Sequence, residues 1–427
     1  MERQSTRQRL HHKVFFLTLC VIACTFPYSI SANRFTIILL VANWLFEGDF
    51  KRKWNVVKSN ITVILLISFY FLHAVALLYT TNMDEGMYQL EKKISFLVFT
   101  VVIVTTQPLT RREFKFVMAS FVASVVVVSF ICLGYAVHRN NYDILHPYWF
   151  YFSYNDLTEI VGLQPNYLAV FTGFAIIIVF YFIVENSTKY RLLRTLMMYA
   201  LILYLTVFLV LLAGRTPLAA TLAVVGAGYL WYFYQTKRLL RGLAIVTVIV
   251  IALGFLVYQI PIMRERMLQT FGVEQTTEWI NQMGNGEGGL PSVRLMKWQS
   301  SWNIIKENWF IGISPGDTQD ALQEEYKKMG FQLAYDERFN PHNQFLQVWV
   351  GLGIIGLIVY LATFWIPLRK AIADVDYLFI AFIAFFIMCC LTESILERQF
   401  GIIFYALFNA MFLQHQHDSV TKPGTGQ

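Results

Sequence analysis

Long runs of apolar residues alternate along the chain with short polar connections. An apolar run of about 17 to 25 residues can cross the hydrocarbon core of a bilayer as a helix. Runs of this kind predict eight membrane spans: Val14–Ile30, Ile61–Thr80, Phe116–Val137, Asn166–Val184, Thr195–Ala213, Pro217–Tyr234, Leu243–Ile260 and Gln344–Ile366. Four shorter runs predict further spans: Phe35–Phe46, Ile94–Gln107, Tyr377–Leu391 and Gly401–Leu413. The pattern therefore predicts an all-α, polytopic membrane bundle of about 12 transmembrane helices.

Lysine and arginine near the span ends predict the orientation of this bundle, because positive charge is retained on the cytoplasmic side. With a cytoplasmic N-terminus, most basic residues fall in the N-terminal leader and in every second connection. We therefore expect both termini to be cytoplasmic. The first span follows a basic leader as a signal peptide does, but we interpret it as an uncleaved helix because further spans follow it.

One long hydrophilic segment interrupts the alternation and divides the chain. Residues 1–260 are expected to hold the N-terminal transmembrane helices, and residues 261–341 to form a large outer loop. Residues 342–413 are expected to hold the C-terminal transmembrane helices, and residues 414–427 to form a cytoplasmic tail. Because the other connections are short, this loop is the main place outside the membrane where chemistry can be built.

Two short helices are predicted in the second half of the loop. The first, Ser292–Asn308, is indicated by apolar residues at three- and four-residue spacing, which form one stripe: Leu295, Trp298, Trp302 and Ile305. The second is expected to begin after Asp317, a favourable N-cap residue, and to reach about Met329. We expect both helices to pack over the outer face of the bundle.

Composition and charge agree with a membrane protein and exclude several other classes. Hydrophobic residues make up 56% of the chain and charged residues only 14%, far from the balance of a soluble globular domain. The net charge of +7 is explained by the basic cytoplasmic connections, so it gives no reason to expect a nucleic-acid partner. The five cysteines all lie in apolar spans, which indicates neither a disulfide framework nor a thiolate metal site.

The unusual polar residues converge on the outer face in this topology. They are Arg215 in a tight turn between two spans, Arg294 at the start of the first loop helix, His342 and Asn343 at the end of the loop, and Glu393 and Arg398 in the last outer connection. Each also has a simpler reading. Arg215 could place its charge at the membrane interface, His342 could be structural, and Glu393 and Arg398 could pair with each other.

A metal site is not predicted. Asp374-Val375-Asp376 has the form of a metal-binding motif of sugar transferases, but it maps to the cytoplasmic side, opposite the other candidates. No carboxylate cluster is evident on the outer face of the predicted topology. We therefore expect no metal and no cofactor.

Several motifs together resemble the O-antigen ligase and polymerase superfamily. They are Arg215 in its turn, Val293-Arg294 before Trp302, Trp309-Phe310-Ile311-Gly312 with Pro315-Gly316, Pro341-His342-Asn343-Gln344-Phe345-Leu346, and Gly351-Leu352-Gly353-Ile354-Ile355-Gly356. The segment from Glu393 to Gly401 is also similar to members of that family. The resemblance covers roughly residues 215–412, whereas the N-terminal half matches only in the spacing of its spans.

The resemblance implies a multi-pass glycosyltransferase of the bacterial inner membrane. Its donor would be a glycan linked to undecaprenyl diphosphate, its acceptor a hydroxyl group on the periplasmic side, and its surroundings membrane lipids. Expulsion of the lipid diphosphate needs cationic groups, and arginine binds phosphate oxygens through a planar fork. We therefore expect Arg215 and Arg294 to bind the diphosphate and His342 to act as the base, in a metal-independent, inverting transfer. Asn343, Glu393 and Arg398 are possible supporting residues.

The acceptor and the class of function stay open at this level. The compact loop with its Pro341-His342-Asn343 sequence favours an O-antigen ligase, which acts on lipid A-core. A polymerase that joins lipid-linked repeat units, or an enzyme that glycosylates proteins, would share the same motifs. A polytopic transporter or flippase is the alternative from another class, but such proteins usually place ionisable residues near the membrane midplane.

Overall fold

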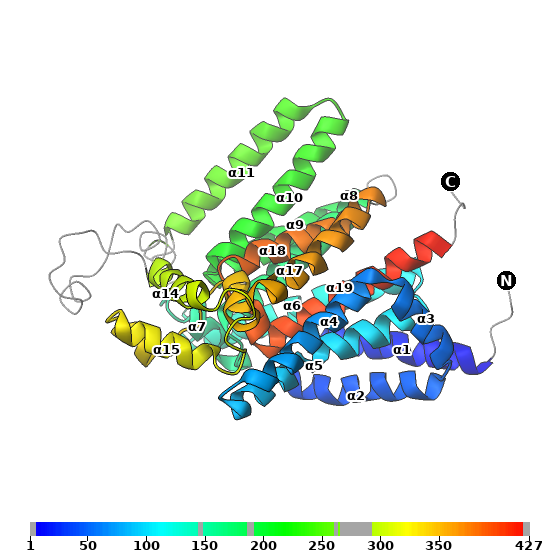
Figure 1. Cartoon of the computed structure of the whole chain (residues 1–427). Coiled ribbons are helices and arrows are strands. Elements are labelled where there is room, and N and C mark those ends of the chain that lie inside the picture. Colours follow the sequence, from blue (N-terminus) through cyan, green and yellow to red (C-terminus); the bar gives the residue numbers. More distant parts are fainter. Residues whose placement is uncertain (1–5, 144–147, 186–191, 260–263, 265–292, 422–427) are drawn as a thin grey trace. The chain divides into compact units, whose positions relative to one another are not determined.

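The computed structural model describes residues 6–143, 148–185, 192–259, 264 and 293–421. Every element within these ranges is a helix, which confirms the predicted all-α fold (Figure 1). The N-terminal helices are α1 (Thr6–Thr25), α2 (Ile30–Glu47), α3 (Phe50–Ser59), α4 (Ile61–Ala76), η1 (Leu77–Tyr79), α5 (Met83–Thr105) and α6 (Arg111–Arg139). The next are α7 (Tyr154–Thr158), η2 (Glu159–Val161), α8 (Pro165–Glu185), α9 (Leu192–Leu211), α10 (Arg215–Gln235) and α11 (Leu239–Gln259). The C-terminal ones are α14 (Val293–Glu307), α15 (Thr318–Lys328), α16 (Gln332–Asp336), α17 (Gln344–Ala373), α18 (Tyr377–Cys390), η3 (Ile395–Glu397) and α19 (Gln399–Thr421).

Each predicted span coincides with a helix, and several of these helices are suited to a bilayer. Six are long and apolar enough to cross a membrane: Ile61–Tyr79, Arg111–Arg139, Pro165–Glu185, Leu192–Leu211, Arg215–Gln235 and Gln344–Ala373. The chain is therefore a membrane protein. The total of about 12 spans, the side of the loop and the position of the termini stay predictions.

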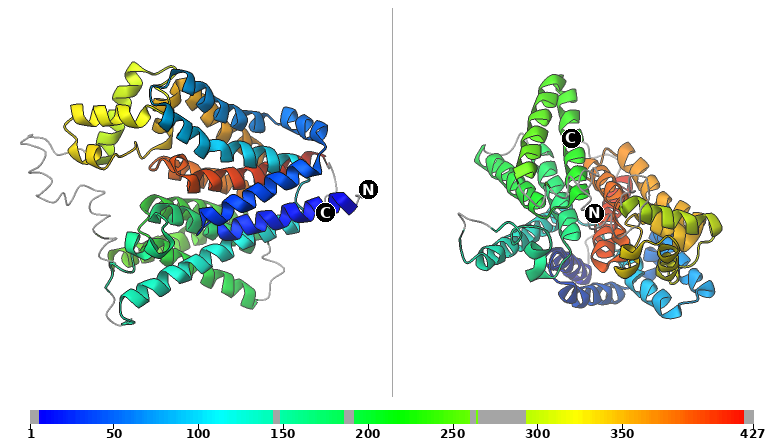
Figure 2. Two further views of the ribbon diagram at one scale, coloured as in Figure 1. Left: turned by 90° about the horizontal axis from the view of Figure 1, so that it is seen from below. Right: turned by 90° about the vertical axis from the view of Figure 1, so that its left-hand side faces the viewer.

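The chain divides into two compact units. The first is drawn from Met1–Ile22, Ser31–Val117 and Glu278–Gln427, and the second from Ala23–Ile30 and Met118–Thr277. In the first unit α19 packs against α5, α17 packs against α4 and α18, and α14 and α15 contact α17 (Figure 2). In the second unit α8 contacts α9 and α10, and α10 and α11 form a helical hairpin (Figure 1).

Side chains that cap helix N-termini fix where several of the spans begin. The amide oxygen of Asn60 accepts hydrogen bonds from the first turn of α4, and that of Asn82 accepts one from Glu85 in α5. Asp376 caps α18 in the same way, so this residue of the Asp374-Val375-Asp376 motif has a structural role. Such caps satisfy N–H groups that have no partner within the helix.

The two predicted loop helices are present as α14 and α15. With α16 and the start of α17 they enclose a small apolar core, formed by Ile304, Ile305, Leu322, Tyr326, Phe331, Ala334 and Val350. The expected apolar stripe of α14 is wrong, because Leu295 and Trp302 are exposed. The helix instead buries a mixed face: Lys297, Ser300, Ser301, Ile304 and Ile305. The serine hydroxyls can be buried because they donate to carbonyl oxygens of their own helix.

Asp317 precedes α15 as expected but does not cap it through its side chain. Its carboxylate instead accepts hydrogen bonds from the backbone N–H groups of Thr81 and Asn82, at 2.9 and 2.8 Å. These residues connect η1 to α5, more than two hundred positions earlier in the chain. Asp317 therefore anchors the start of α15 to the connection between η1 and α5. Local sequence does not reveal this role.

Helix α17 is interrupted near its start. Gly353 has a φ of 64° and a ψ of −167°, so the helical hydrogen-bond pattern breaks there. The chain between α14 and α15 fills the break: Ile313 donates to the carbonyl oxygen of Val350 at 2.9 Å, and Ile354 donates to that of Trp309 at 2.9 Å. The chain between α14 and α15 is thus hydrogen-bonded to the backbone of a membrane helix.

The last helix continues past the expected end of its span. α19 reaches Thr421, beyond Leu413, and Gln414 is buried. Its amide group donates to the carbonyl oxygen of Ile103 at 2.6 Å and accepts from the N–H of Leu109 at 3.4 Å. Gln414 thereby satisfies backbone groups in the connection between α5 and α6.

Candidate active site

His342 lies in the turn between α16 and α17. Its φ of 47° puts it in the left-handed region, which residues other than glycine rarely occupy. The side chain of Asn340 accepts a hydrogen bond from the N–H of His342 at 2.9 Å and so closes this turn. The edge of the imidazole ring also packs against Phe339, with the ring centroids 5.8 Å apart. The residues before α17 therefore hold the imidazole in a defined orientation.

Glu393 binds the imidazole of His342. Nδ1 of His342 lies 3.2 Å from Oε1 and 3.3 Å from Oε2 of this carboxylate. An ionised carboxylate only accepts hydrogen bonds, so Nδ1 carries the proton in this contact. In the neutral form of the ring Nε2 is then the nitrogen without a proton, which is the form that a general base requires. The simpler reading paired Glu393 with Arg398; the structure shows that Glu393 contacts His342 and that Arg398 is exposed.

The two residues after His342 hold the connection that carries Glu393. Asn343 donates from its backbone to Oγ of Ser394 at 3.2 Å and from its side chain to the carbonyl oxygen of Leu391 at 3.1 Å. The side chain of Gln344 accepts from the N–H of Leu396 at 2.7 Å. His342, Asn343 and Gln344 thus all contact the chain that follows α18. Asn343 also caps α17, which gives it two structural roles.

Two cations on α14 lie beside Glu393. Burial lowers the pKa of Arg294, while the negative charge of Glu393 opposes that shift. Burial also lowers the pKa of Lys297, to about 8; Glu393 opposes this shift and Arg294 adds to it. The ammonium group of Lys297 lies over the ring of Phe339, 4.5 Å from its centroid. We call Arg294, Lys297, Phe339, His342 and Glu393 the His342 cluster.

Lys297 is the member of this cluster that sequence reasoning missed. Its three-residue spacing from Arg294 puts both side chains on the same face of a helix, a signal that could have drawn attention to it. The apolar stripe predicted for α14 did not include this position. Only the packing of α14 shows that Lys297 is buried.

Arg215 lies in the second compact unit, so its role beside the His342 cluster stays a prediction. The tight turn expected before it is present. Ala213 has a φ of 53°, and a Cβ on Gly214 would lie 2.5 Å from Cβ of Ala169 in α8. Arg215 then begins α10. The N-terminus of a helix favours negatively charged ligands.

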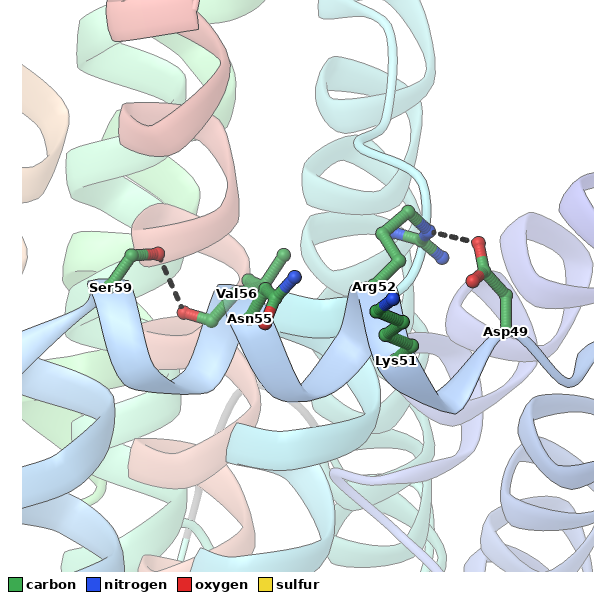
Figure 3. A pocket seen from close by; sticks show the side chains of 6 residues that line it. All are labelled: Asp49, Lys51, Arg52, Asn55, Val56 and Ser59. Carbon is green, nitrogen blue, oxygen red and sulfur yellow. Dashed lines mark hydrogen bonds and ion pairs between the residues drawn. The ribbon is translucent and has the colours of Figure 1, made fainter.

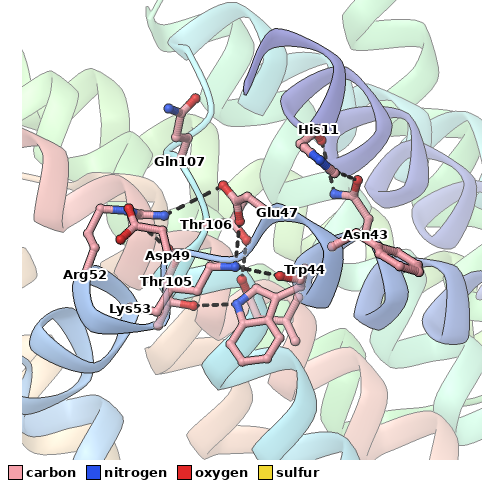
Figure 4. Close-up of polar contacts among 12 residues, drawn as sticks. His11, Asn43, Trp44, Glu47, Asp49, Arg52, Lys53, Thr105, Thr106 and Gln107 are labelled. Atoms are coloured by element: carbon pink, nitrogen blue, oxygen red, sulfur yellow. Dashed lines mark hydrogen bonds and ion pairs between the residues drawn. The ribbon is translucent and has the colours of Figure 1, made fainter. Parts of the chain in front are cut away.

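A separate pocket lies along α3 in the first unit (Figure 3). It has a volume of about 500 Å³ and is lined by Asp49, Lys51, Arg52, Asn55, Val56 and Ser59. Its basic side chain Arg52 is already compensated, because it pairs with Asp49 at 2.9 Å and donates to the carbonyl oxygen of Thr105 at 3.0 Å (Figure 4). Lys53, next to it, is buried and pairs with Glu47 at 2.8 Å. These contacts are structural, so we do not assign the chemistry to this pocket.

The His342 cluster joins an imidazole, a carboxylate bound to it and two cations within one compact unit. Residues 200–361 match the family model described as O-Antigen ligase, a range that contains Arg215, Arg294 and His342. The match covers less than half of the chain, and Glu393 lies outside it. No curated protein matches the chain. Over residues 200–361 this membrane protein is therefore similar to the O-antigen ligase family.

Proposed function

We propose that this protein transfers a glycan from undecaprenyl diphosphate to a hydroxyl group of lipid A-core on the periplasmic face of the bacterial inner membrane. The observation that carries the proposal is the contact of His342 with Glu393, whose charge also acts on the half-buried Arg294. The match to the O-antigen ligase family supports the same class of reaction. The donor, the acceptor and the side of the membrane belong to the proposal.

In the proposed reaction His342 is the general base. Nε2 accepts the proton of the acceptor hydroxyl while that oxygen attacks the anomeric carbon of the donor sugar. Glu393, bound to Nδ1, stabilises the imidazolium that forms. The bond between the anomeric carbon and the diphosphate breaks at the same time, and a single displacement inverts the anomeric centre.

In this scheme the two arginines stabilise the negative charge of the leaving diphosphate. Negative charge grows on the diphosphate as it departs, and cations already in place stabilise that charge without further reorganisation. Arg294 lies in the first turn of α14, where the negative charge of Glu393, the partner of the proposed base, acts on it. Arg215 is the second arginine proposed to bind the diphosphate.

A purified enzyme tests the catalytic roles. In proteoliposomes with lipid-linked donor and acceptor, we expect His342→Ala to abolish transfer and the exposed control His138→Ala to retain it. Arg294→Lys should be slow, because lysine lacks the bidentate fork. Substantial turnover by His342→Ala would remove this residue from the role of base.

The same assay tests the metal-independent mechanism. We expect transfer to persist in EDTA, because the charge of the leaving group is met by guanidinium groups rather than by a divalent ion. Activity that disappears in EDTA and returns with magnesium or manganese would contradict this part of the proposal.

The lipopolysaccharide of a cell lacking this chain distinguishes a ligase from a polymerase. Loss of the long-chain ladder together with accumulation of polymerised, lipid-linked glycan is the outcome expected of a ligase. Capping of the core by single repeat units would instead identify a polymerase. Movement of donor across a membrane without bond formation in proteoliposomes would identify a transporter.

A further inference from the structure

We propose that Lys297 is a further ligand for the diphosphate of the donor, next to Arg294. This inference rests on the proposed glycan transfer and deepens it, since it adds a second α14 cation to the site. Lys297 lies one turn after Arg294, and its ammonium group is over the ring of Phe339, which also packs against His342. The diphosphate would therefore be bound close to the proposed base.

The burial of Lys297 is the first argument. Only 6% of this side chain is exposed. Within the residues that the structure describes, its ammonium group has the face of Phe339 beside it but neither a hydrogen bond nor an ion pair. A buried ammonium group is costly unless it is compensated, and aromatic contact replaces only part of its hydration. An anionic ligand would supply the missing partner.

The charge of the cluster is the second argument. Arg294 and Lys297 are cationic, Glu393 is the carboxylate that faces both, and it is shared with His342. With the imidazole neutral, these groups carry one more positive charge than negative. A diphosphate complements this excess, and a guanidinium fork and an ammonium point charge can bind different oxygens of the same group.

A different role for Lys297 has to be separated from this one. A lysine that has lost its proton can itself act as a base. Lys297→Arg distinguishes the two roles, because arginine retains the positive charge at all accessible pH values but cannot accept the proton. A diphosphate ligand should tolerate this replacement, whereas a base should not.

Binding of undecaprenyl diphosphate to the purified full-length protein is the first test. We expect Lys297→Met to weaken this binding about tenfold to a hundredfold, and Lys297→Arg to restore most of it. Lys306→Met, on the exposed face of the same helix, is the matched control and should bind as the wild type does. Without ligand, Lys297→Met should unfold at the same temperature or higher, because it removes a buried charge.

The pH dependence of kcat/KM for the lipid-linked donor is the second test. The lysine is charged below its pKa of about 8, so donor capture by the wild type should decline as the pH rises through that value. Lys297→Arg should lack this alkaline decline. Because Arg294, Glu393 and His342 also face the site, it is the difference between wild type and Lys297→Arg that reports on Lys297.

The outcomes separate the two proposals. A wild-type protein that does not transfer glycan from the lipid-linked donor overturns the proposed function. Transfer by the wild type, with Lys297→Met equal to it in binding and in kcat/KM, overturns only the role of Lys297. Loss of activity in Lys297→Arg with intact binding of undecaprenyl diphosphate also overturns it, because that result would make Lys297 a base.

Discussion

At the scale of single residues, the proposed chemistry depends on which nitrogen of His342 carries the proton. In the neutral ring, the contact between Nδ1 and the carboxylate of Glu393 favours the tautomer with its proton on Nδ1, which leaves Nε2 to accept another. Phe339 and the turn from Asn340 restrict the ring further. Glu393, Phe339 and Asn340 therefore hold the imidazole in the orientation proposed for a general base before any substrate is bound.

Replacement of Glu393 by glutamine tests this preparation. The amide cannot stabilise the imidazolium as a carboxylate does, so we expect kcat to fall about tenfold to a hundredfold. KM for the lipid-linked donor should change much less. Glu337→Gln, an exposed acid on the outer segment, is the control in the same proteoliposome assay. Wild-type kcat in Glu393→Gln would mean that the contact with His342 is only structural.

At the scale of elements, hydrogen bonds at the interruption of α17 join this membrane helix to the chain between α14 and α15. Backbone groups of residues 309–314 bind those of residues 350–354, so neither segment can keep its conformation without the other. The backbone angles at Gly353 belong to a region that is accessible essentially only to glycine. A Cβ there would also lie 2.2 Å from the carbonyl oxygen of Phe310.

Gly353→Ala should therefore be strongly destabilising. We expect a loss of about 3 kcal/mol or more in the free energy of unfolding, from backbone strain together with the clash. Gly134→Ala in α6 is the matched control, because a Cβ there meets open space and alanine favours a helix. Thermal unfolding in detergent measures both variants, and equal midpoints would contradict the proposed strain.

Asp317 makes the stability of α14 and α15 depend on pH. Burial acts to raise its pKa, but hydrogen bonds from Thr81 and Asn82 outweigh burial and lower it. A carboxyl group with a lowered pKa contributes stability above its unfolded pKa and loses it as the pH falls. We expect the outer helices to loosen in acid below about pH 4, the range in which unperturbed aspartate titrates.

Asp317→Ala should remove this acid dependence and loosen α14 and α15 already at neutral pH. Hydrogen exchange of these two helices measures the effect, with Glu324→Ala on the exposed face of α15 as the control. If Asp317→Ala leaves exchange in α14 and α15 unchanged, the anchor to Thr81 and Asn82 has no energetic importance.

At the scale of the whole molecule, the first compact unit brings distant parts of the chain to the site. Lys93 of α5 is buried and pairs with Glu397 of η3 at 3.3 Å. Lys92 donates to the backbone carbonyl of Glu397 at the same distance of 3.3 Å. The connection that carries Glu393 is thus held from one side by the residues after His342 and from the other by α5.

Replacing one partner of this ion pair should destabilise the protein more than replacing both partners. Glu397→Gln leaves the charge of Lys93 buried and uncompensated, for which we expect a loss of about 3 kcal/mol in the free energy of unfolding. The double variant Lys93→Met with Glu397→Gln should recover part of that loss, because no charge is left behind. Additive effects in a double-mutant cycle would show that the two side chains do not interact.

The sequence by itself determined the class of the protein and the limits of its elements. Apolar runs of membrane length and the three- and four-residue spacing in α14 are local signals, so a helix overlaps each predicted span and both predicted loop helices are present. His342 could be chosen because a titratable residue beside a predicted span is unusual, and Arg294 because it opens the first predicted loop helix. These conclusions need only neighbouring residues in the chain.

Only the tertiary structure decided which of these residues meet. The partner of His342 is Glu393, 51 positions later, and the partners of Asp317 lie 235 and 236 positions earlier. The burial of Lys297 and the interruption of α17 follow in the same way from packing between segments that are not adjacent in sequence. Local periodicity indicates the conformation of a segment but not which other segments pack against it. For this reason it did not show that Leu295 and Trp302 of the predicted α14 stripe are exposed.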